Sequence, residues 1–429
     1  MDSSGASSSA SEAEASSSSS SALYRYPDWV LLGTDTLIDP DDHFHATSAG
    51  AITSKGEPIH VSFRAVPPPG VSSVYVRWTR GNRRSEPLPS VAAAHRNSIL
   101  LKLRRGYNSK DLFVYTASST GPTWLRLLPA FERNYYDDDY GTLCRKFSLN
   151  HIDLLCDGGG EEFVVAELKI EPKSRYFYGR RRDDDDTTPV EAALLVFRSS
   201  SPGDNWKATQ PRIRHKKGQG EELASWSSDE TVPYGDSLCY VDYSRGVFFV
   251  DVLSECPELR YVSLPVKIPT ICPYGLKTLT DHSQVSPGRC RRLCVTDGGR
   301  TMKFVEVVTT TAFMSRGRAT ASALFTINVW RLRREGKSMT WEKESHMEDS
   351  ELWTQQGYGD LPRVAPTWPR VSMGEPNVIY LTIDADETWV IIVVDMLTKT
   401  LRSSFRYTRS RTQFLVSSLS TCMCLRPAN

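Results

Sequence analysis

LCDGGGEEFVVAE, residues 155–167, recurs further along the chain as LCVTDGGRTMKFVEVV, residues 293–308. Each stretch contains a short apolar run, an Asp-Gly turn and a second run rich in β-branched and aromatic residues. This pattern is typical of a β-hairpin, whose tight turn needs positive φ angles that glycine adopts without strain. A third apolar run and then a tryptophan, Trp206 or Trp341, follow each hairpin. The two stretches predict a repeated meander of three or four strands.

Short runs of the same kind recur along the whole chain between clusters of Gly, Pro, Asp, Asn or Ser, and no segment has helical periodicity. With weaker runs, we expect roughly 20 strands, a number that suits a sandwich, a barrel or a propeller. Degenerate copies of the hairpin unit at 239–251 and 378–395 favour repeated blades. The predicted fold is therefore all-β, a propeller-like array of antiparallel meander sheets, with about five or six four-stranded units; a large β-sandwich is the alternative. The clearest expected strands are 59–63, 74–78, 99–103, 112–116, 163–168, 192–197, 247–253, 304–309, 324–332, 378–383 and 389–396.

Composition narrows the class of protein. The 429 residues carry 52 basic and 51 acidic side chains, a net charge of +1. Such balance removes the long-range attraction on which nucleic-acid binders depend and makes a local basic patch less expected. No apolar run approaches the ~18 residues that span a bilayer, so we expect no membrane partner. The nine cysteines are scattered and odd in number, which predicts reduced thiols.

The N-terminal segment differs from the rest of the chain. Residues 1–22 are almost entirely Ser and Ala, without the basic start and apolar core of a secretory signal. We interpret them as a disordered tail, because such a composition cannot bury enough apolar surface to fold. The expected organisation is this tail followed by one propeller-like domain over 23–429. The expected location is cytoplasmic or nuclear.

A central stretch, YVDYSRGVFFVDVL at 240–253 followed by CPELRYVSLP at 256–265, resembles plant proteins grouped as domain of unknown function 1618. The segments 26–32, 157–168 and 376–380 are similar to that family as well. The resemblance implies a plant protein with the named domain at about 240–390. The Arg-Gly turn, the strand ending in Asp and the Leu-Pro close also resemble propellers associated with F-box proteins, although no F-box-like helical segment precedes them. The family's function is unknown, so the resemblance supplies no site residues.

Several residue clusters resemble chemical sites, and each also has a structural interpretation. Gly158 to Gly160 precede two glutamates and a strand, which indicates a hairpin turn and not a phosphate loop. Cys290 and Cys294 with His282, or Cys422 and Cys424, lack a complete zinc pattern. The remaining candidates are interpreted as turns or loops: His43 and His45 beside Asp39, Asp41 and Asp42; the calcium-like run 384–387; and the Asp-Tyr run 135–140. The sequence thus predicts no catalytic, cofactor-binding or metal residues, and no cofactor.

Without catalytic signatures, the leading hypothesis is a non-catalytic β scaffold whose loops bind another protein or a peptide. Two charged segments, 179–188 and 212–220, are expected to be surface loops. One alternative is a carbohydrate-active hydrolase, since paired carboxylates are adjacent in space and not in sequence. A second alternative is a regulatory factor that contacts nucleic acid through a basic, aromatic-lined face.

Overall fold

The computed structural model describes residues 27–38, 47–78, 89–105, 109–117, 123–131, 144, 147–157, 162–173, 190–201, 203, 205–266, 287–310, 324–336, 338–385, 388–408 and 419–424. The predicted disordered tail at 1–22 lies outside these residues. So do the loop at 179–188, the His43–His45 pair and the Asp-Tyr run. Among the described helices, none is long and apolar enough to cross a membrane.

The described residues are almost entirely β, as predicted, and form six groups of mostly antiparallel strands that we number sheets 1 to 6. A single backbone pairing, Asp35 with Ser90, joins sheets 1 and 2. Sheet 1 contains β1 (Trp29–Ile38), β2 (Ala49–Ile52), β3 (Pro58–Arg64), β4 (Val71–Trp78) and β26 (Leu419–Cys424). Sheet 2 contains β5 (Ser90–His95), β6 (Ser98–Arg104), β7 (Lys110–Thr116) and β8 (Trp124–Leu127), and sheet 3 contains β9 (Ile152–Cys156), β10 (Phe163–Pro172), β11 (Val190–Arg198) and β12 (Lys207–Thr209).

Sheets 4 to 6 continue the same plan. Sheet 4 has an added outer strand that makes it five-stranded: β13 (Arg212–Arg214), β14 (Glu230–Tyr234), β15 (Ser237–Asp242), β16 (Gly246–Asp251) and β17 (Glu258–Ser263). Sheet 5 contains β18 (Arg291–Thr296), β19 (Thr301–Thr310), β20 (Leu324–Glu335) and β21 (Ser338–Glu348). Sheet 6 contains β22 (Thr367–Val371), β23 (Val378–Ala385), β24 (Thr388–Asp395) and β25 (Thr400–Thr408).

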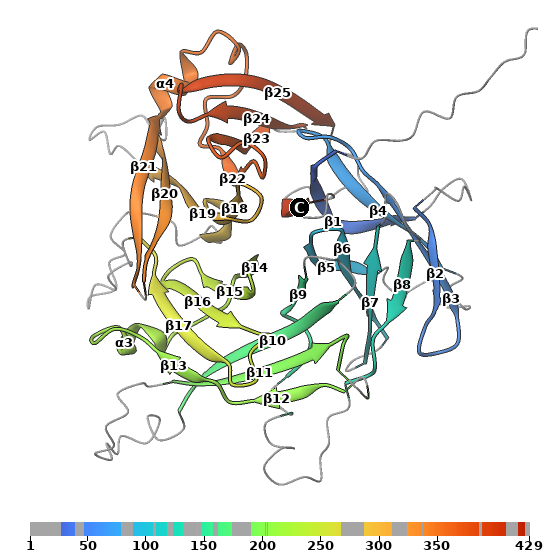
Figure 1. Cartoon of the computed structure of the whole chain (residues 1–429). Coiled ribbons are helices and arrows are strands. Elements are labelled where there is room, and N and C mark those ends of the chain that lie inside the picture. The colour runs from blue at the N-terminus through green and yellow to red at the C-terminus, as the bar shows by residue number, and fades with distance from the viewer. Residues whose placement is uncertain are drawn as a thin grey trace, which may run out of the picture.

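The six sheets are arranged in a ring (Figure 1), with β5, β9, β14, β18 and β22 near its centre. Each sheet packs face to face against the next, because its strands carry apolar residues on both faces. A separate apolar core fills every junction: one between sheets 1 and 2, and the rest in order round the ring. The last core, around Leu31 and Tyr380, lies between sheets 6 and 1 and completes the circle.

The ring is closed by pairing between distant parts of the chain. Strand β1 pairs with β4 in parallel and, along residues 29–33, with β26 in antiparallel register. Sheet 1 therefore contains both the first and the last described strands. Its apolar residues Val30, Leu31 and Leu32 are fully buried.

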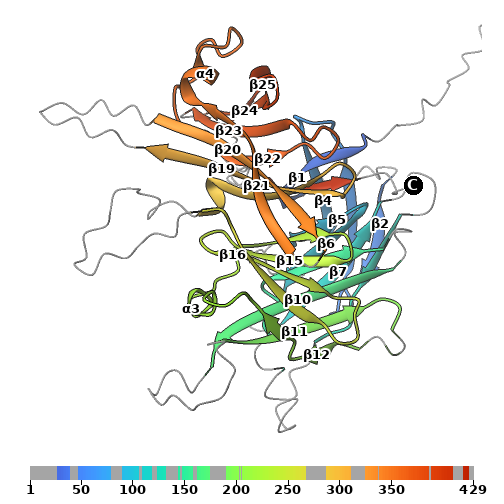
Figure 2. The ribbon, with the colours of Figure 1, turned by 60° about the vertical axis from the view of Figure 1, so that its left-hand side comes forward.

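The helical elements are short. In the described part of the chain they are α3 (Gly220–Leu223), α4 (Asp349–Trp353) and the single turn η1 (Pro287–Arg289). Figure 2 shows α3 and α4 at the outside of the ring and the long β20–β21 hairpin running alongside sheet 4. These outer elements define the space described below.

All four predicted hairpin units form paired strands, but they do not occupy the same strand positions within their sheets. The units at 155–167 and 293–308 form the first and second strands of sheets 3 and 5, β9–β10 and β18–β19. The degenerate copies form the second and third strands, β15–β16 and β23–β24, of sheets 4 and 6. They match because every hairpin with two buried strands has a similar pattern. The turn after β18 has the predicted positive φ at Asp297 and Gly298.

The expectation of roughly 20 strands was too low, since the described residues contain 26. The missed strands include β12 and β13, which have three residues each and few apolar side chains. Residues 212–220 were expected to form a loop, but they begin with β13, which pairs in parallel with β17. Strand β13 forms because it hydrogen-bonds to the edge strand β17. This pairing is between distant segments, so the composition of β13 alone does not predict a strand.

Gly246 begins β16, and close packing explains its lack of a side chain. An added Cβ would lie 2.5 Å from Cε2 of Tyr261, whose ring is buried. We expect Gly246→Ala to lower the free energy of unfolding by about 1–3 kcal/mol, because a packed core must shift to accept the methyl group. Denaturant unfolding would measure this. Gly357→Ala is the control, since its Cβ would meet Leu401 at an ordinary 3.6 Å; equal effects of the two changes would contradict the packing argument.

Candidate functional site

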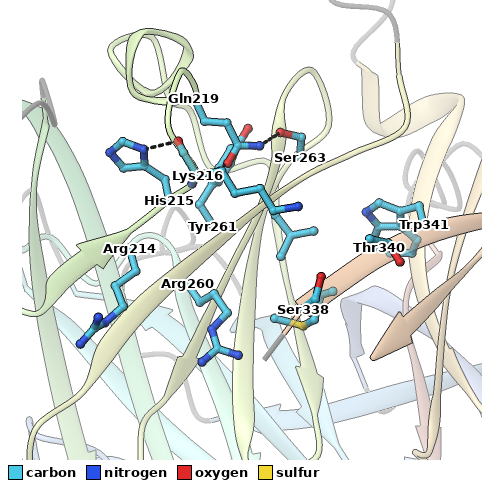
Figure 3. A pocket seen from close by; sticks show the side chains of 12 residues that line it. Arg214, His215, Lys216, Gln219, Arg260, Tyr261, Ser263, Ser338, Thr340 and Trp341 are labelled. Carbon is cyan, nitrogen blue, oxygen red and sulfur yellow. Dashed lines mark hydrogen bonds between the residues drawn. The ribbon is translucent and has the colours of Figure 1, made fainter. Parts of the chain in front are cut away.

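A cavity of about 350 Å³ lies at the outer rim of the ring, between β13 and β17 of sheet 4 and β21 of sheet 5. We call it the basic pocket. Figure 3 shows basic side chains on the sheet 4 side and hydroxyl and aromatic side chains on the β21 side. No carboxylate is among its lining residues, which are Arg214, His215, Lys216, Gln219, Arg260, Tyr261, Val262, Ser263, Ser338, Met339, Thr340 and Trp341.

Two arginines form one wall of the basic pocket. Arg214 of β13 is the register partner of Arg260 of β17, so both side chains lie on the same face of the sheet. Like charges placed opposite each other destabilise a strand pair. Glu258 offsets part of this cost by accepting two hydrogen bonds from Arg214, at 2.5 and 2.6 Å. This pair is exposed and contributes little stability. Within the described residues, Arg260 has no ion-pair partner.

The segment that carries Lys216 is held against sheet 4 by a chain of hydrogen bonds. The Lys216 backbone amide donates to Gln219 Oε1 at 3.0 Å, and Gln219 Nε2 donates to Ser263 Oγ at 2.7 Å. Ser263 in turn donates to Glu222 Oε1 of α3 at 3.1 Å. The His215 ring nitrogen Nδ1 lies 2.9 Å from the Lys216 carbonyl. The position of the lysine backbone is thus set before any ligand arrives.

The third wall belongs to sheet 5 and to the apolar core between sheets 4 and 5. Met339 is buried in that core, and Val262 and Trp341 pack at its edge. Trp341 also packs against Phe304, with ring centroids 6.1 Å apart. Ser338 and Thr340 are exposed at the start of β21. The basic pocket therefore combines cations, hydroxyl groups and a small apolar surface.

From the sequence, residues 212–220 were predicted to form a surface loop. The balanced charge of the whole chain also made a local basic patch less expected. The structure corrects this expectation: the cations converge because β13 joins β17 and β21 lies opposite. Arg260, Ser338 and Trp341 carried no sequence signal, since residues far apart in the chain meet only through this pairing.

A second polar cluster lies near the centre of the ring, on β14, β18 and β22, and we call it the axial cluster. Glu230 forms ion pairs with Arg292 at 3.0 Å and with Arg370 at 3.4 Å. The Tyr243 hydroxyl donates to Glu230 and accepts from the Leu293 amide at 3.0 Å. Tyr243, Arg292 and Arg370 are all buried. The axial cluster thus joins the inner strands of sheets 4, 5 and 6.

Asp153 of β9 faces this region from sheet 3. Burial raises the pKa of its carboxyl well above the usual range, and the charge of Glu230 raises it further, against a hydrogen bond from the Leu154 amide at 2.8 Å. A buried carboxyl group with a raised pKa is a common feature of catalytic acids. Here Asp153 is only 8% exposed and Tyr243 is 0% exposed, so their surroundings are those of a packed joint.

The metal-site candidates of the sequence do not form a metal-binding cluster where the structure describes them. Cys290 and Cys294 are free thiols, half-buried and buried, and no cluster of three or more metal-binding side chains occurs among the described residues. Burial raises the pKa of Cys294 above its ordinary value. His282 and the side chains of Cys422 and Cys424 lie outside the described part. Asp384 is at the end of β23, a hairpin tip as expected.

The fold and these sites define a class, an all-β ring of sheets, and sequence comparison adds a match to a family model over part of the chain. Residues 240–380 match the family model described as "Protein of unknown function (DUF1618)". The matched segment begins in β15 and ends in β23, so it includes sheet 5 and parts of sheets 4 and 6. It contains Arg260, Ser338 and Trp341 of the basic pocket and most of the axial cluster. A search of curated proteins gives no match.

The similarity to solved structures is remote. Hydrazine synthase of Kuenenia stuttgartiensis is similar with a TM-score of 0.30 and 10% identity, over 74% of this chain and 80% of that one. A protein from Lactobacillus plantarum has a TM-score of 0.29 and 8% identity, over 84% and 94%. The α-L-arabinofuranosidase Arb93A of Fusarium graminearum, solved with an iminosugar inhibitor, has a TM-score of 0.24 and 9% identity, over 88% and 85%. These values carry no argument about activity.

Proposed function

We propose that this protein is a non-catalytic binding scaffold whose basic pocket receives an acidic segment of a partner protein. The observation that carries the proposal is the make-up of the pocket walls: Arg214, Lys216 and Arg260 converge, and no carboxylate is among the lining residues. Arginine forks hydrogen-bond carboxylates in a bidentate manner, and a partly enclosed site strengthens such contacts. The rigid ring holds the donors in place and reduces the entropy lost on binding.

The pocket favours a peptide group over the two alternative functions. A retaining or inverting glycosidase needs two carboxyl groups on either side of the bond that it cleaves, and the basic pocket lacks them. A nucleic-acid strand needs a continuous basic track. Here Glu258 pairs with Arg214 and Glu222 accepts a hydrogen bond from Ser263, so carboxylates interrupt the positive charge around the cavity. A local anionic side chain suits that distribution better.

We expect Arg260→Glu to weaken the binding of a fluorescein-labelled acidic peptide, Gly-(Glu)₅-Gly, by roughly 10–100-fold. The change removes one charge-assisted contact and adds repulsion, and such contacts are worth about 1.5–3 kcal/mol. Fluorescence anisotropy at low salt measures the affinity. Arg406→Glu is the matched control, because Arg406 is exposed on β25 of another sheet. Equal loss in both variants would indicate only general charge attraction, and no binding by the unaltered protein would refute the proposal.

A further inference from the structure

The sheet 4 wall of the basic pocket places cations beside an apolar side chain, and the inference from it rests on the proposed function. Arg260 and Val262 are two residues apart on β17, so their side chains lie on the same face of sheet 4. Arg214 joins them as the register partner of Arg260. Val262 packs against the core between sheets 4 and 5, so this face is turned towards β21.

The β21 wall of the pocket is apolar where it faces sheet 4. Met339 and Trp341 are two residues apart on the strand, and both pack in the core between sheets 4 and 5. Ser338 and Thr340 alternate with them and therefore lie on the opposite face of β21. A ligand between the two walls meets apolar side chains on one side, and guanidinium groups next to Val262 on the other.

The net charge around the pocket matches a ligand with one carboxylate. The permanent cations among the lining residues are Arg214, Lys216 and Arg260. Two carboxylates offset them: Glu258 pairs with Arg214, and Glu222 accepts a hydrogen bond from a lining serine. One positive charge is left, and Arg260 is the guanidinium without an ion pair in the described part of the chain. A single carboxylate would balance this charge and fit the planar guanidinium fork.

We propose that the basic pocket binds the C-terminal residue of the partner segment, and that this residue has an apolar side chain. Such a residue carries its α-carboxylate and its side chain on one Cα atom, so both groups can enter the same cavity. An internal acidic residue and its apolar neighbour cannot, because successive side chains of an extended chain point to opposite sides. The carboxylate pairs with Arg260, and the side chain contacts Val262, Met339 and Trp341. A volume of about 350 Å³ is at the small end for ligand pockets and suits one residue.

The outer edge of β17 favours a peptide over a free acid. Strand β13 pairs with residues 258–260 of β17, whereas β16 pairs with residues 259–263. Within the described ranges, residues 261–263 therefore have no strand on their outer side, and all three line the pocket. The backbone of an extended partner segment can form hydrogen bonds along such an edge.

The test compares three peptides with fluorescein at the amino end. The leucine acid is Gly-Glu-Gly-Glu-Gly-Leu with a free carboxylate. The leucine amide is Gly-Glu-Glu-Glu-Gly-Leu with a C-terminal amide, so it also carries three carboxylates. The glycine acid has Gly in place of the final Leu of the leucine acid. We expect the leucine acid to bind about tenfold more tightly than the leucine amide and about threefold or more tightly than the glycine acid.

Variants of the protein locate the recognition. Arg260→Gln should remove most of the preference for the leucine acid over the leucine amide, because it takes away the guanidinium that pairs with the carboxylate. Arg406→Gln is the matched control and should leave the preference unchanged, since Arg406 is exposed on another sheet. Acetyl-leucine should compete only at concentrations about tenfold or more above those of the unlabelled leucine acid, because it lacks the backbone groups that pair with β17.

The possible outcomes separate the two proposals. Equal affinity for the leucine acid and the leucine amide would overturn the C-terminal inference and leave the acidic-segment proposal intact. Equal affinity for the leucine and glycine acids would also overturn this inference, because the apolar wall would then contribute nothing. Absence of binding by all three peptides would overturn both proposals. Competition by acetyl-leucine as strong as that by the peptide would make the pocket a site for small carboxylic acids, and a preference that persists in Arg260→Gln would place recognition elsewhere; either result contradicts the inference.

Discussion

Glu230→Gln is expected to destabilise the protein by about 3–5 kcal/mol, one of the two largest effects that the structure predicts. The neutral amide can still accept hydrogen bonds, but it no longer offsets the charges of Arg292 and Arg370. Both arginines are buried, and a buried charge that loses its counter-charge costs far more than a surface pair. A melting temperature lowered by at least about 5 °C would be the readout, by scanning calorimetry at neutral pH.

Asp153→Asn is the matched control for this prediction. Burial raises the pKa of Asp153, so its folded form keeps the proton at pH values at which the unfolded chain has lost it. The raised pKa lowers the free energy of unfolding most at pH values above the folded pKa. This loss becomes smaller as the pH falls towards 3.8. Asparagine resembles the neutral acid, so we expect unchanged or slightly higher stability at neutral pH. If Asp153→Asn destabilises as much as Glu230→Gln, the charge assignment in the axial cluster is wrong.

Deletion of residues 419–429 is expected to lower stability by several kcal/mol, because it removes β26. Five residues of β1 lose their antiparallel partners, and each backbone hydrogen bond contributes a net of about 0.5–1.5 kcal/mol. The deletion also uncovers the strand that carries Val30, Leu31 and Leu32. Thermal unfolding of the truncated chain would show the loss, and size-exclusion chromatography would show association through the free edge.

Two further measurements make the deletion experiment specific. A synthetic peptide with the sequence of residues 416–427, added under reducing conditions, should restore part of the lost melting temperature by pairing with β1 in trans. Deletion of residues 1–22 should leave the melting temperature unchanged, since β1 starts at Trp29. Full stability of the chain without 419–429 would mean that β26 does not contribute to ring closure.

The sequence predicted the fold well where strands are buried on both faces. Strands β10, β11 and β24 contain long runs of apolar residues, because most of their residues are buried on both faces of the sheet. Outer strands such as β13 are short and polar, and only pairing with a distant strand fixes them. The repeated hairpins could be recognised because their strands are buried on both faces. The position of each hairpin within its sheet could not be recognised, because any two adjacent buried strands give the same pattern.

The candidate sites were less predictable than the fold. Arg214 and Arg260 become neighbours only through the parallel pairing of β13 with β17, a contact between segments 44 or more residues apart. Glu230, Arg292 and Arg370 meet only because the inner strands of three sheets converge. Basic clusters and single charges are common in any sequence. These particular residues form sites only because the ring geometry brings them together, and local sequence patterns do not encode that geometry.

The sharing of sheet 1 between β1 and β26 has a consequence for biosynthesis. A ribosome adds roughly 5–20 residues per second, so β1 emerges some tens of seconds before the strand that will cover it. During that interval the nascent chain presents an apolar, unpaired edge to other polypeptides. We therefore expect the yield of soluble protein to depend on chaperones that bind nascent chains, and slower translation to increase aggregation in their absence.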